Sequence, residues 1–283
     1  INTTGPNGQP VGINISQLCP NSINLTSCNG GSLPGMQLYQ YQGIVVLSPP
    51  CNTWTIGYSP PCCRNNNNIN NLTTASSGTF VFATLNSQND SCNSSPAFST
   101  NFPNPYACVN QQVCYDYGVT EQDGDSMVYS LVSAYTALNA PAGYNAGFTP
   151  NIPIPGITIN PQTGKLQFTP TTAGNYVVVV QICEYSRQTG LLLGCVMRDM
   201  QFVVDVCANQ APSLCTSDTI ANFSGNGAII NNNTVEVCYG QNFSFDVVIT
   251  DPDPFDSLTA TSNITSVLPG ATMTLNHAPG GNP

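Results

Sequence analysis

The chain has 283 residues, of which 4 are basic and 14 acidic, so its formal net charge is −10. This scarcity of Lys and Arg excludes nucleic-acid binding, because phosphate contacts are made chiefly by those side chains. Membrane insertion is excluded as well, since no apolar run reaches the ~18 residues that cross a bilayer. Because 41% of the residues are hydrophobic and only 6% charged, we expect two or three folded domains.

Cysteine usage points to an oxidising compartment. The chain has 13 cysteines and one histidine, which favours disulfides over a zinc site built from Cys and His. We therefore expect an extracellular or cell-surface protein. No positively charged apolar segment precedes the first strand candidate, so we interpret Ile1 as a processed start or as the edge of a fragment.

Residues 1–91 are expected to form a separate N-terminal, Cys-rich β domain. They hold five cysteines and the only tryptophan, and their strand candidates are residues 37–47, 53–58 and 78–85. The Asn-rich tract 64–71 reads as a polar loop.

Residues 92–207 show the clearest strand pattern. Short runs of β-branched and aromatic residues alternate with Gly, Pro and Asn turn signals, and helical periodicity is absent. The candidate strands are residues 128–132, 156–159, 165–168, 176–184, 191–196 and 200–206. This spacing is typical of an antiparallel β-sandwich, so the fold class we predict is all-β.

Residues 208–283 are predicted to be a second copy of this module. Residues 107–111 (ACVNQ) align with 237–241 (VCYGQ), and the same register superposes Asp116 on Asp246 and Asp123 on Asp253. The copy ends before any counterpart of residues 163–170 or of the hairpin that follows them. We expect either that it continues in a longer chain or that a neighbouring subunit donates the missing strands.

Two acidic loops occupy matching positions in the two copies. Three carboxylates fall close together in each loop: Glu121, Asp123 and Asp125 in the first, and Asp251, Asp253 and Asp256 in the second. Clustered carboxylates repel one another unless a hard cation such as Ca²⁺ neutralises them. The alternative is that Asp-Gly and Asp-Pro simply form solvated turns.

One disulfide can be predicted from hairpin symmetry. The segment 181–197 turns around residues 188–190, so Cys183 and Cys195 should face each other across two antiparallel strands. Cys114 is the competing partner for Cys183. The alternative for Cys114 is a local bridge to Cys108. Cys19–Cys28 and a bridge from Cys51 to Cys62 or Cys63 are further guesses.

Several stretches resemble large cell-surface proteins of the Bacteroidota. They are residues 48–56 (SPPCNTWTI), 92–96 (CNSSP), 123–131 (DGDSMVYSL), 164–170 (GKLQFTP) and 198–202 (RDMQF). Those proteins carry tandem immunoglobulin-like or cadherin-like sandwich repeats, and many are gliding-motility-associated, type 9 secreted adhesins. The resemblance implies an extracellular filament or stalk that is adhesive or structural.

The resemblance also implies particular residue roles. The segment 207–212 (CANQAP) resembles the linker that completes calcium sites between cadherin-like domains, with Asn209 as a carbonyl ligand, although the usual run of Asp is missing. Ser126, Thr219 and Ser257 follow Asp and precede an apolar residue, as in the bacterial O-glycosylation signal of that phylum.

We expect no enzyme, because the only histidine, His277, lies in a terminal loop without catalytic context. The expected function is a repeat-built structural or adhesive surface protein that binds copies of itself or neighbouring domains and is stiffened by calcium. The alternative is a lectin-like module that binds surface glycans through Trp54 and neighbouring tyrosines, although burial in a core also accounts for Trp54.

Overall fold

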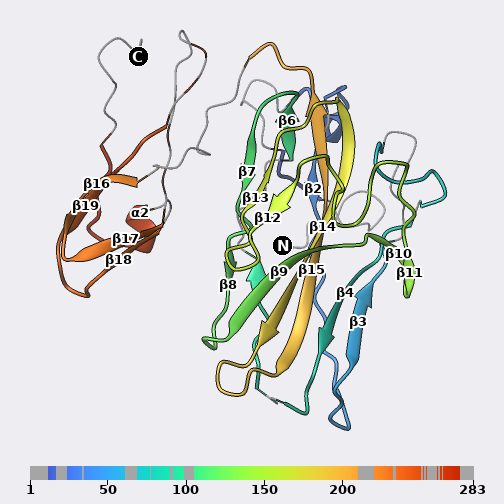
Figure 1. Cartoon of the computed structure of the whole chain (residues 1–283), viewed down its shortest axis with the longest axis horizontal. Helices are drawn as coiled ribbons and strands as arrows, with labels where there is room; N and C mark the ends of the chain where they lie inside the picture. Colours follow the sequence, from blue (N-terminus) through green and yellow to red (C-terminus); the bar gives the residue numbers. More distant parts are fainter. Residues whose placement is uncertain are drawn as a thin grey trace.

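The computed structural model describes residues 12–16, 24–33, 35–60, 69–76, 78–89, 92–98, 105–209, 220–231, 234–249, 251, 253, 260, 262 and 264–274. In these ranges nearly all regular structure is β (Figure 1). The helical elements there are one 3-10 turn, η2 (Ser27–Asn29), and one short helix, α2 (Ile264–Val267). Neither helix could span a membrane. The all-β prediction is confirmed.

The largest sheet holds six strands. Its antiparallel order is β3 (Trp54–Tyr58), β4 (Val81–Leu85), β15 (Leu192–Asp205), β14 (Gly174–Tyr185) and β9 (Ser126–Val132). The sixth strand, β6 (Tyr106–Cys108), pairs in parallel with the end of β15. The long hairpin β14–β15 is therefore the centre to which all other strands of this sheet attach.

Among the described residues, a smaller sheet and three two-stranded ladders accompany the main sheet, and together they form the first unit of the structure. The smaller sheet has the order β12 (Thr158–Ile159), β13 (Leu166–Phe168) and β7 (Val113–Tyr115). The ladders are β1 (Ile13–Asn14) with β2 (Gln37–Leu38), β5 (Ala97–Phe98) with β8 (Val119–Thr120), and β10 (Tyr135–Ala137) with β11 (Ala140–Pro141). The main apolar core includes buried side chains from β13, β14 and β15.

Strand β14 is buried on both of its faces. Side chains alternate between the two faces of a strand, and Val178, Val180 and Ile182 belong to the main core. On the opposite face, Val177 and Val179 pack in a second cluster with Ile69, Leu72, Ala134 and Ala142. The uninterrupted valine run is explained by this position, because a strand covered on both faces needs no polar side.

The end of the Asn-rich tract is part of this second cluster. Asn71 is fully buried. Its side-chain amide donates hydrogen bonds to the backbone carbonyls of Val177 (2.7 Å) and Pro153 (3.0 Å). Its Oδ1 accepts a hydrogen bond from the backbone amide of Val177 (3.0 Å). Asn71 therefore satisfies backbone groups of β14. Residues 69–71 belong to no strand, as predicted for a loop, but Ile69 and Asn71 are buried and do not face solvent. Residues 64–68 lie outside the described residues.

The main sheet crosses the domain boundary that we placed between residues 91 and 92. Strands β3 and β4 precede this boundary, yet β4 pairs with β15 through Leu85 opposite Gly194 and Thr84 opposite Cys195. Because these strands share one hydrogen-bonded sheet with the central hairpin, β3 and β4 belong to the same folded unit as residues 105–209. This corrects the expectation of a separate N-terminal domain.

The second unit consists of two ladders, β16 (Ile220–Gly225) with β19 (Phe243–Val247) and β17 (Gly227–Asn231) with β18 (Thr234–Val237). Its turn after β18 has the geometry of the turn after β6. The backbone amide of Gln111 donates a hydrogen bond to the carbonyl of Cys108, and the backbone amide of Gln241 donates one to the carbonyl of Cys238. Asn110 and Gly240 have positive φ angles of 62° and 76° at the aligned position, where Gly and Asn are the tolerated residues.

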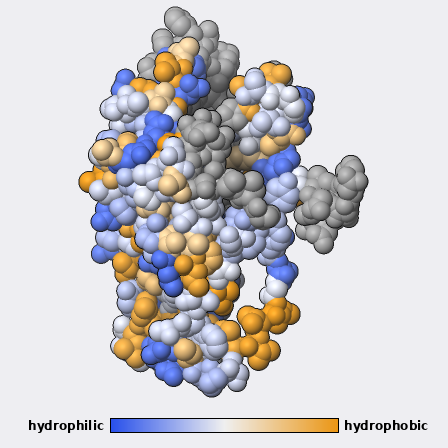
Figure 2. All heavy atoms as spheres, turned by 90° about the vertical axis from the view of Figure 1, so that its right-hand side faces the viewer, coloured by the Kyte–Doolittle hydropathy of each residue, from blue (hydrophilic) through white to orange (hydrophobic). Residues whose placement is uncertain are grey.

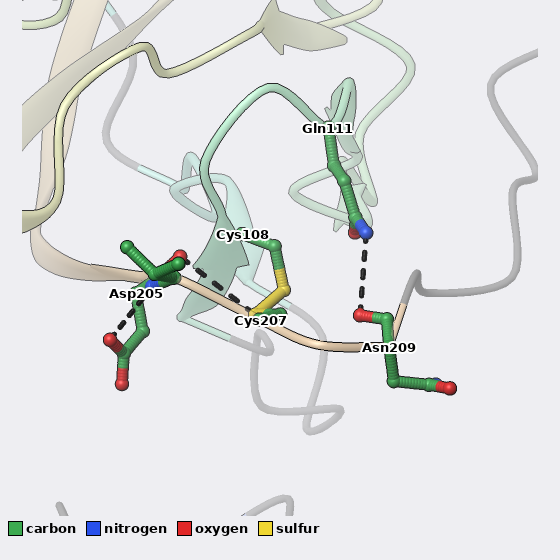
Figure 3. The surroundings of a disulfide bond; sticks show 6 residues. Cys108, Gln111, Asp205, Cys207 and Asn209 are labelled. Carbon is green, nitrogen blue, oxygen red and sulfur yellow. Dashed lines mark hydrogen bonds between the residues drawn. A yellow bond between two sulfur atoms is a disulfide. The ribbon is translucent and has the colours of Figure 1, made fainter.

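Two disulfides are formed among the described residues. Cys183 pairs with Cys195 across β14 and β15, which confirms the prediction from hairpin symmetry. Cys108 pairs with Cys207 (Figure 3), so the predicted pair Cys108–Cys114 is wrong. The reason is long-range: β6 lies parallel to the end of β15, with Cys108 opposite Asp205. Cys114 is disulfide-bonded, but neither to Cys108 nor to Cys183. Cys28 and Cys51 are free thiols, so the pairings of Cys28 with Cys19 and of Cys51 with Cys62 or Cys63 are wrong.

We predict that the double substitution Cys108→Ser/Cys207→Ser lowers the free energy of unfolding by about 2 to 5 kcal/mol, because this bridge closes a loop across a sequence separation of 99 residues. Urea unfolding under non-reducing conditions measures the change. The matched control is Cys238→Ser, which removes an exposed free thiol and should leave the unfolding midpoint unchanged. Equal midpoints for all three proteins would contradict the prediction.

Candidate functional site

Three carboxylates meet at the hairpin end of the main sheet. Oxygen atoms of Glu121, Asp125 and Glu184 all lie within 4.8 Å of one another. Glu121 follows β8, Asp125 immediately precedes β9, and Glu184 is the penultimate residue of β14. We call these three side chains the acidic cluster.

The loop between β8 and β9 is organised around the carboxylate of Glu121. Its Oε1 accepts a hydrogen bond from the amide of Asp123 (2.7 Å), and its Oε2 accepts one from the amide of Asp125 (2.6 Å). Gly124 has a φ of 80°, a backbone conformation that favours glycine. Oδ1 of Asp125 accepts a hydrogen bond from the backbone amide of Arg187 (2.8 Å). This bond connects the loop to the β14–β15 turn.

Glu184 is the buried member of the cluster. Its side chain has no solvent exposure, and the pairing register places it between Met127 of β9 and Gly194 of β15. Its Oε2 accepts a hydrogen bond of 2.6 Å from the side-chain amide of Asn93. Its Oε1 is buried without a hydrogen-bond partner, and so is Oδ1 of Asn93. Two buried acceptor oxygens therefore have no donor.

Burial raises the pKa of the Glu184 carboxyl to about 7, because removal from water disfavours its charged form. The hydrogen bond from Asn93 lowers the pKa, while the negative charges of Glu121 and Asp125 raise it. A hydrogen bond to the carboxylate of Glu121, which only the protonated form of Glu184 can donate, raises it as well. Within the described part of the chain, none of the three carboxylates forms an ion pair with a basic side chain. Near neutral pH the cluster therefore needs either a proton or a cation.

The arrangement suits a hard cation. Calcium binds oxygen ligands at about 2.3 to 2.6 Å, so two ligands of one ion can be up to about 5 Å apart, which matches the separation in the cluster. Three carboxylates and the unpartnered Oδ1 of Asn93 are the oxygen donors that Ca²⁺ prefers. An ion there would supply the positive charge that the buried acceptors lack.

Asp123 is not part of the cluster. Its Oδ2 accepts a hydrogen bond from the amide of Ser94 (2.6 Å), so this carboxylate fixes the segment before β5. Of the three acids predicted for the first loop, the structure therefore brings Glu121 and Asp125 together and adds Glu184.

Asn209 lies at the opposite end of the sheet. Its backbone carbonyl accepts a hydrogen bond from the side chain of Gln111, next to the Cys108–Cys207 bridge (Figure 3). Glu184 lies opposite Gly194, whereas the bridge follows Asp205, and the stretch of β15 between them is about 35 Å long at ~3.3 Å per residue. Asn209 therefore cannot bind the same ion as Glu121 and Asp125. Its role as a carbonyl ligand between domains stays a prediction.

The second acidic loop repeats part of the first. Asp251 accepts at Oδ1 from the amide of Asp253 (2.9 Å), as Glu121 does from Asp123. These four residues are aligned in the repeat, so the loop turn is shared by both copies. Asp256 lies outside the described residues, and Asp251 and Asp253 belong to no cluster of three potential ligands in the described part of the chain.

The remaining predicted positions have mixed outcomes. Ser126 is exposed at the start of β9, and its glycosylation stays a prediction, while Thr219 and Ser257 lie outside the described residues. Trp54 is half-buried in β3, and its indole N–H is buried without a hydrogen-bond partner. The exposed aromatic surface comes instead from Tyr41 and Tyr58, whose ring centroids are 5.2 Å apart.

Sequence reasoning missed Glu184, although a signal was present. Residue 184 has the same parity as Val178, Val180 and Ile182, so the alternation of a strand places it on the core face. A carboxylate at a core-facing position of a strand is uncommon unless it has a partner, and this is the signal that could have identified it.

The chain matches no protein-family model, no curated protein and no solved structure.

We predict that unfolding in the presence of a chelator depends on pH through Glu184. Its pKa is about 7 in the folded protein against an ordinary value of 4.5, so the folded state holds a proton that the unfolded state releases between these values. The resulting stabilisation is complete below the ordinary pKa and is lost as pH rises through about 7.

The measurement is the urea midpoint of the wild type and of Glu184→Gln across this pH range. The difference between the two isolates residue 184, because all other titrating groups are shared. We expect the wild type to lose stability relative to the variant as pH rises. Parallel curves would show that Glu184 titrates normally.

Proposed function

We propose that this chain is a structural or adhesive module of an extracellular, repeat-built surface protein, and that calcium stiffens its sandwich at the acidic cluster. The cell-surface proteins that the sequence resembles are of this kind. The two disulfides support an oxidising location, and the turn geometries common to both units support a tandem repeat.

The observation that carries the proposal is the unsatisfied carboxylate of Glu184. A buried acceptor without a donor costs about 1 to 3 kcal/mol, and more if it is charged. A cation held by Glu184, Glu121 and Asp125 would remove that cost and would tie the β8–β9 loop to the central strand. Asn93 would extend the contact to the segment that leads into β5.

The proposed role of the cation is therefore internal to one module. The end of β15, from which the chain leaves towards residue 220, is held by other means, namely the Cys108–Cys207 bridge and the hydrogen bond from Gln111 to Asn209. The bridge and this hydrogen bond limit the freedom of the first residues of the linker, and the cation would stiffen the opposite end of the sandwich. Such a module resists deformation along its long axis.

A glycan-binding module is the second candidate. The observation that favours it is the exposed pair Tyr41 and Tyr58, with Tyr39 also exposed, since aromatic rings with a polar edge form sugar platforms. Trp54 is the weaker candidate because its indole N–H is buried. A glycan array that compares the wild type with Tyr41→Ala separates the two candidates: binding that this substitution abolishes would support the lectin-like function.

We predict that Ca²⁺ raises the melting temperature of the chelated wild type by several degrees at neutral pH, because an ion that binds only the folded state stabilises it in proportion to its occupancy. Glu184→Gln should abolish the shift, since an amide oxygen carries no charge for the ion. Glu236→Gln is the matched control, because Glu236 is exposed in β18, and it should keep the full shift.

Calorimetric titration with Ca²⁺ and with Mg²⁺ measures binding directly. The proposal is contradicted if the wild type shows neither binding heat nor a melting shift, or if Glu184→Gln keeps the shift that the wild type shows.

A further inference from the structure

An apolar segment stands exposed before β3. In residues 43–47 (GIVVL), Ile44 is 97% and Val46 is 86% exposed, and Val45 is exposed as well. Figure 2 views the side on which β3 lies and shows hydrophobic groups at the lower end of the molecule, including a cluster that projects from the body. Three consecutive exposed β-branched residues are unusual on a surface, where apolar side chains are normally scattered.

The backbone of this segment is unpaired. Residues 42–47 form no hydrogen bond within the segment or with any other described residue, and the segment belongs to no strand. Backbone amide and carbonyl groups beside apolar side chains are the pattern that adds as a strand to an open sheet edge. The segment therefore has both requirements of a donor strand.

An open edge of matching length is present on the same chain. β3 is the terminal strand of the main sheet, so among the described residues one side of Trp54–Tyr58 has no strand partner. The side chains of Ile56 and Tyr58 in this strand are exposed. Five residues of the segment correspond to the five residues of β3.

The charges favour a second copy of the chain as the occupant. Residues 1–63 contain no Asp, Glu, Lys or Arg, although the whole chain has a net charge of −10. The charged side chains that usually protect an edge strand are thus missing here. Two neutral surfaces, the segment of one copy and the β3 edge of another, do not repel each other, and a charged partner would lose hydration without gaining an ion pair.

We propose that residues 43–47 of one copy add as a strand to the β3 edge of a second copy, so that the chain associates with itself. This inference rests on the assembly role proposed above and names its partner and surface. Donor and acceptor are different surfaces of each copy. One-sided addition therefore leaves both ends open and extends into a filament, whereas reciprocal addition closes a dimer.

The test is sedimentation equilibrium of the full chain over a range of concentrations, in Ca²⁺ and in chelator. We expect the average mass of the wild type to rise with concentration. Val45→Lys should weaken association at least tenfold by placing a charge in the strand pairing. Leu138→Lys is the matched control, because Leu138 is an exposed apolar residue between β10 and β11, and it should associate like the wild type.

Amide hydrogen exchange supplies a readout that does not depend on the variants. Residues 42–47 and β3 should become protected as concentration rises. A wild type that stays monomeric in both buffers, or a Val45→Lys protein that associates normally, would overturn the inference. Concentration-independent protection would show instead that the segment pairs within its own chain. Glu184→Gln should associate normally, so failure of the cation proposal is distinguishable from failure of this one.

Discussion

Burial of β14 on both faces is the constraint on which the rest of the structure depends. A strand of valines can only be stable if apolar layers cover both sides, and this chain provides them from distant segments: the smaller sheet with the main core on one face, and residues 69–72 with the 134–142 region on the other. Asn71 shows how tightly the second layer is held, since it bonds both backbone groups of Val177. The hairpin partner β15 then carries β4 and β6.

The acidic cluster follows from the same strand. The alternation that buries Val178, Val180 and Ile182 also turns Glu184 towards the core side at the strand's end. A chain that exposes so few charges thus buries one carboxylate at the point where the β8–β9 loop presents two more. Three of the 14 acidic residues of the chain therefore meet at one place in this sandwich, whereas residues 1–63, which include β3, carry no charged side chain.

Local patterns were predictable from the sequence and long-range pairings were not. Hairpin symmetry was enough to pair Cys183 with Cys195, and the spacing of Glu121 and Asp125 was enough to mark the loop. The Cys108–Cys207 bridge depends on a parallel contact between residues about a hundred positions apart, which no local signal specifies. The attachment of β4 to β15 likewise depends on sheet edges that exist only after the hairpin has formed. Asp123 shows a further limit: its neighbours in sequence suggested a ligand, but its carboxylate bonds to Ser94.

The central claim is that a cation completes the buried carboxylate group at the end of β14. The most direct measurement is anomalous X-ray diffraction from crystals grown with calcium. The account predicts one anomalous peak within about 2.3 to 2.6 Å of oxygens from Glu121, Asp125 and Glu184. Absence of a peak there, with a carboxyl oxygen of Glu184 hydrogen-bonded to that of Glu121, would contradict it, because a shared proton would then satisfy the buried group.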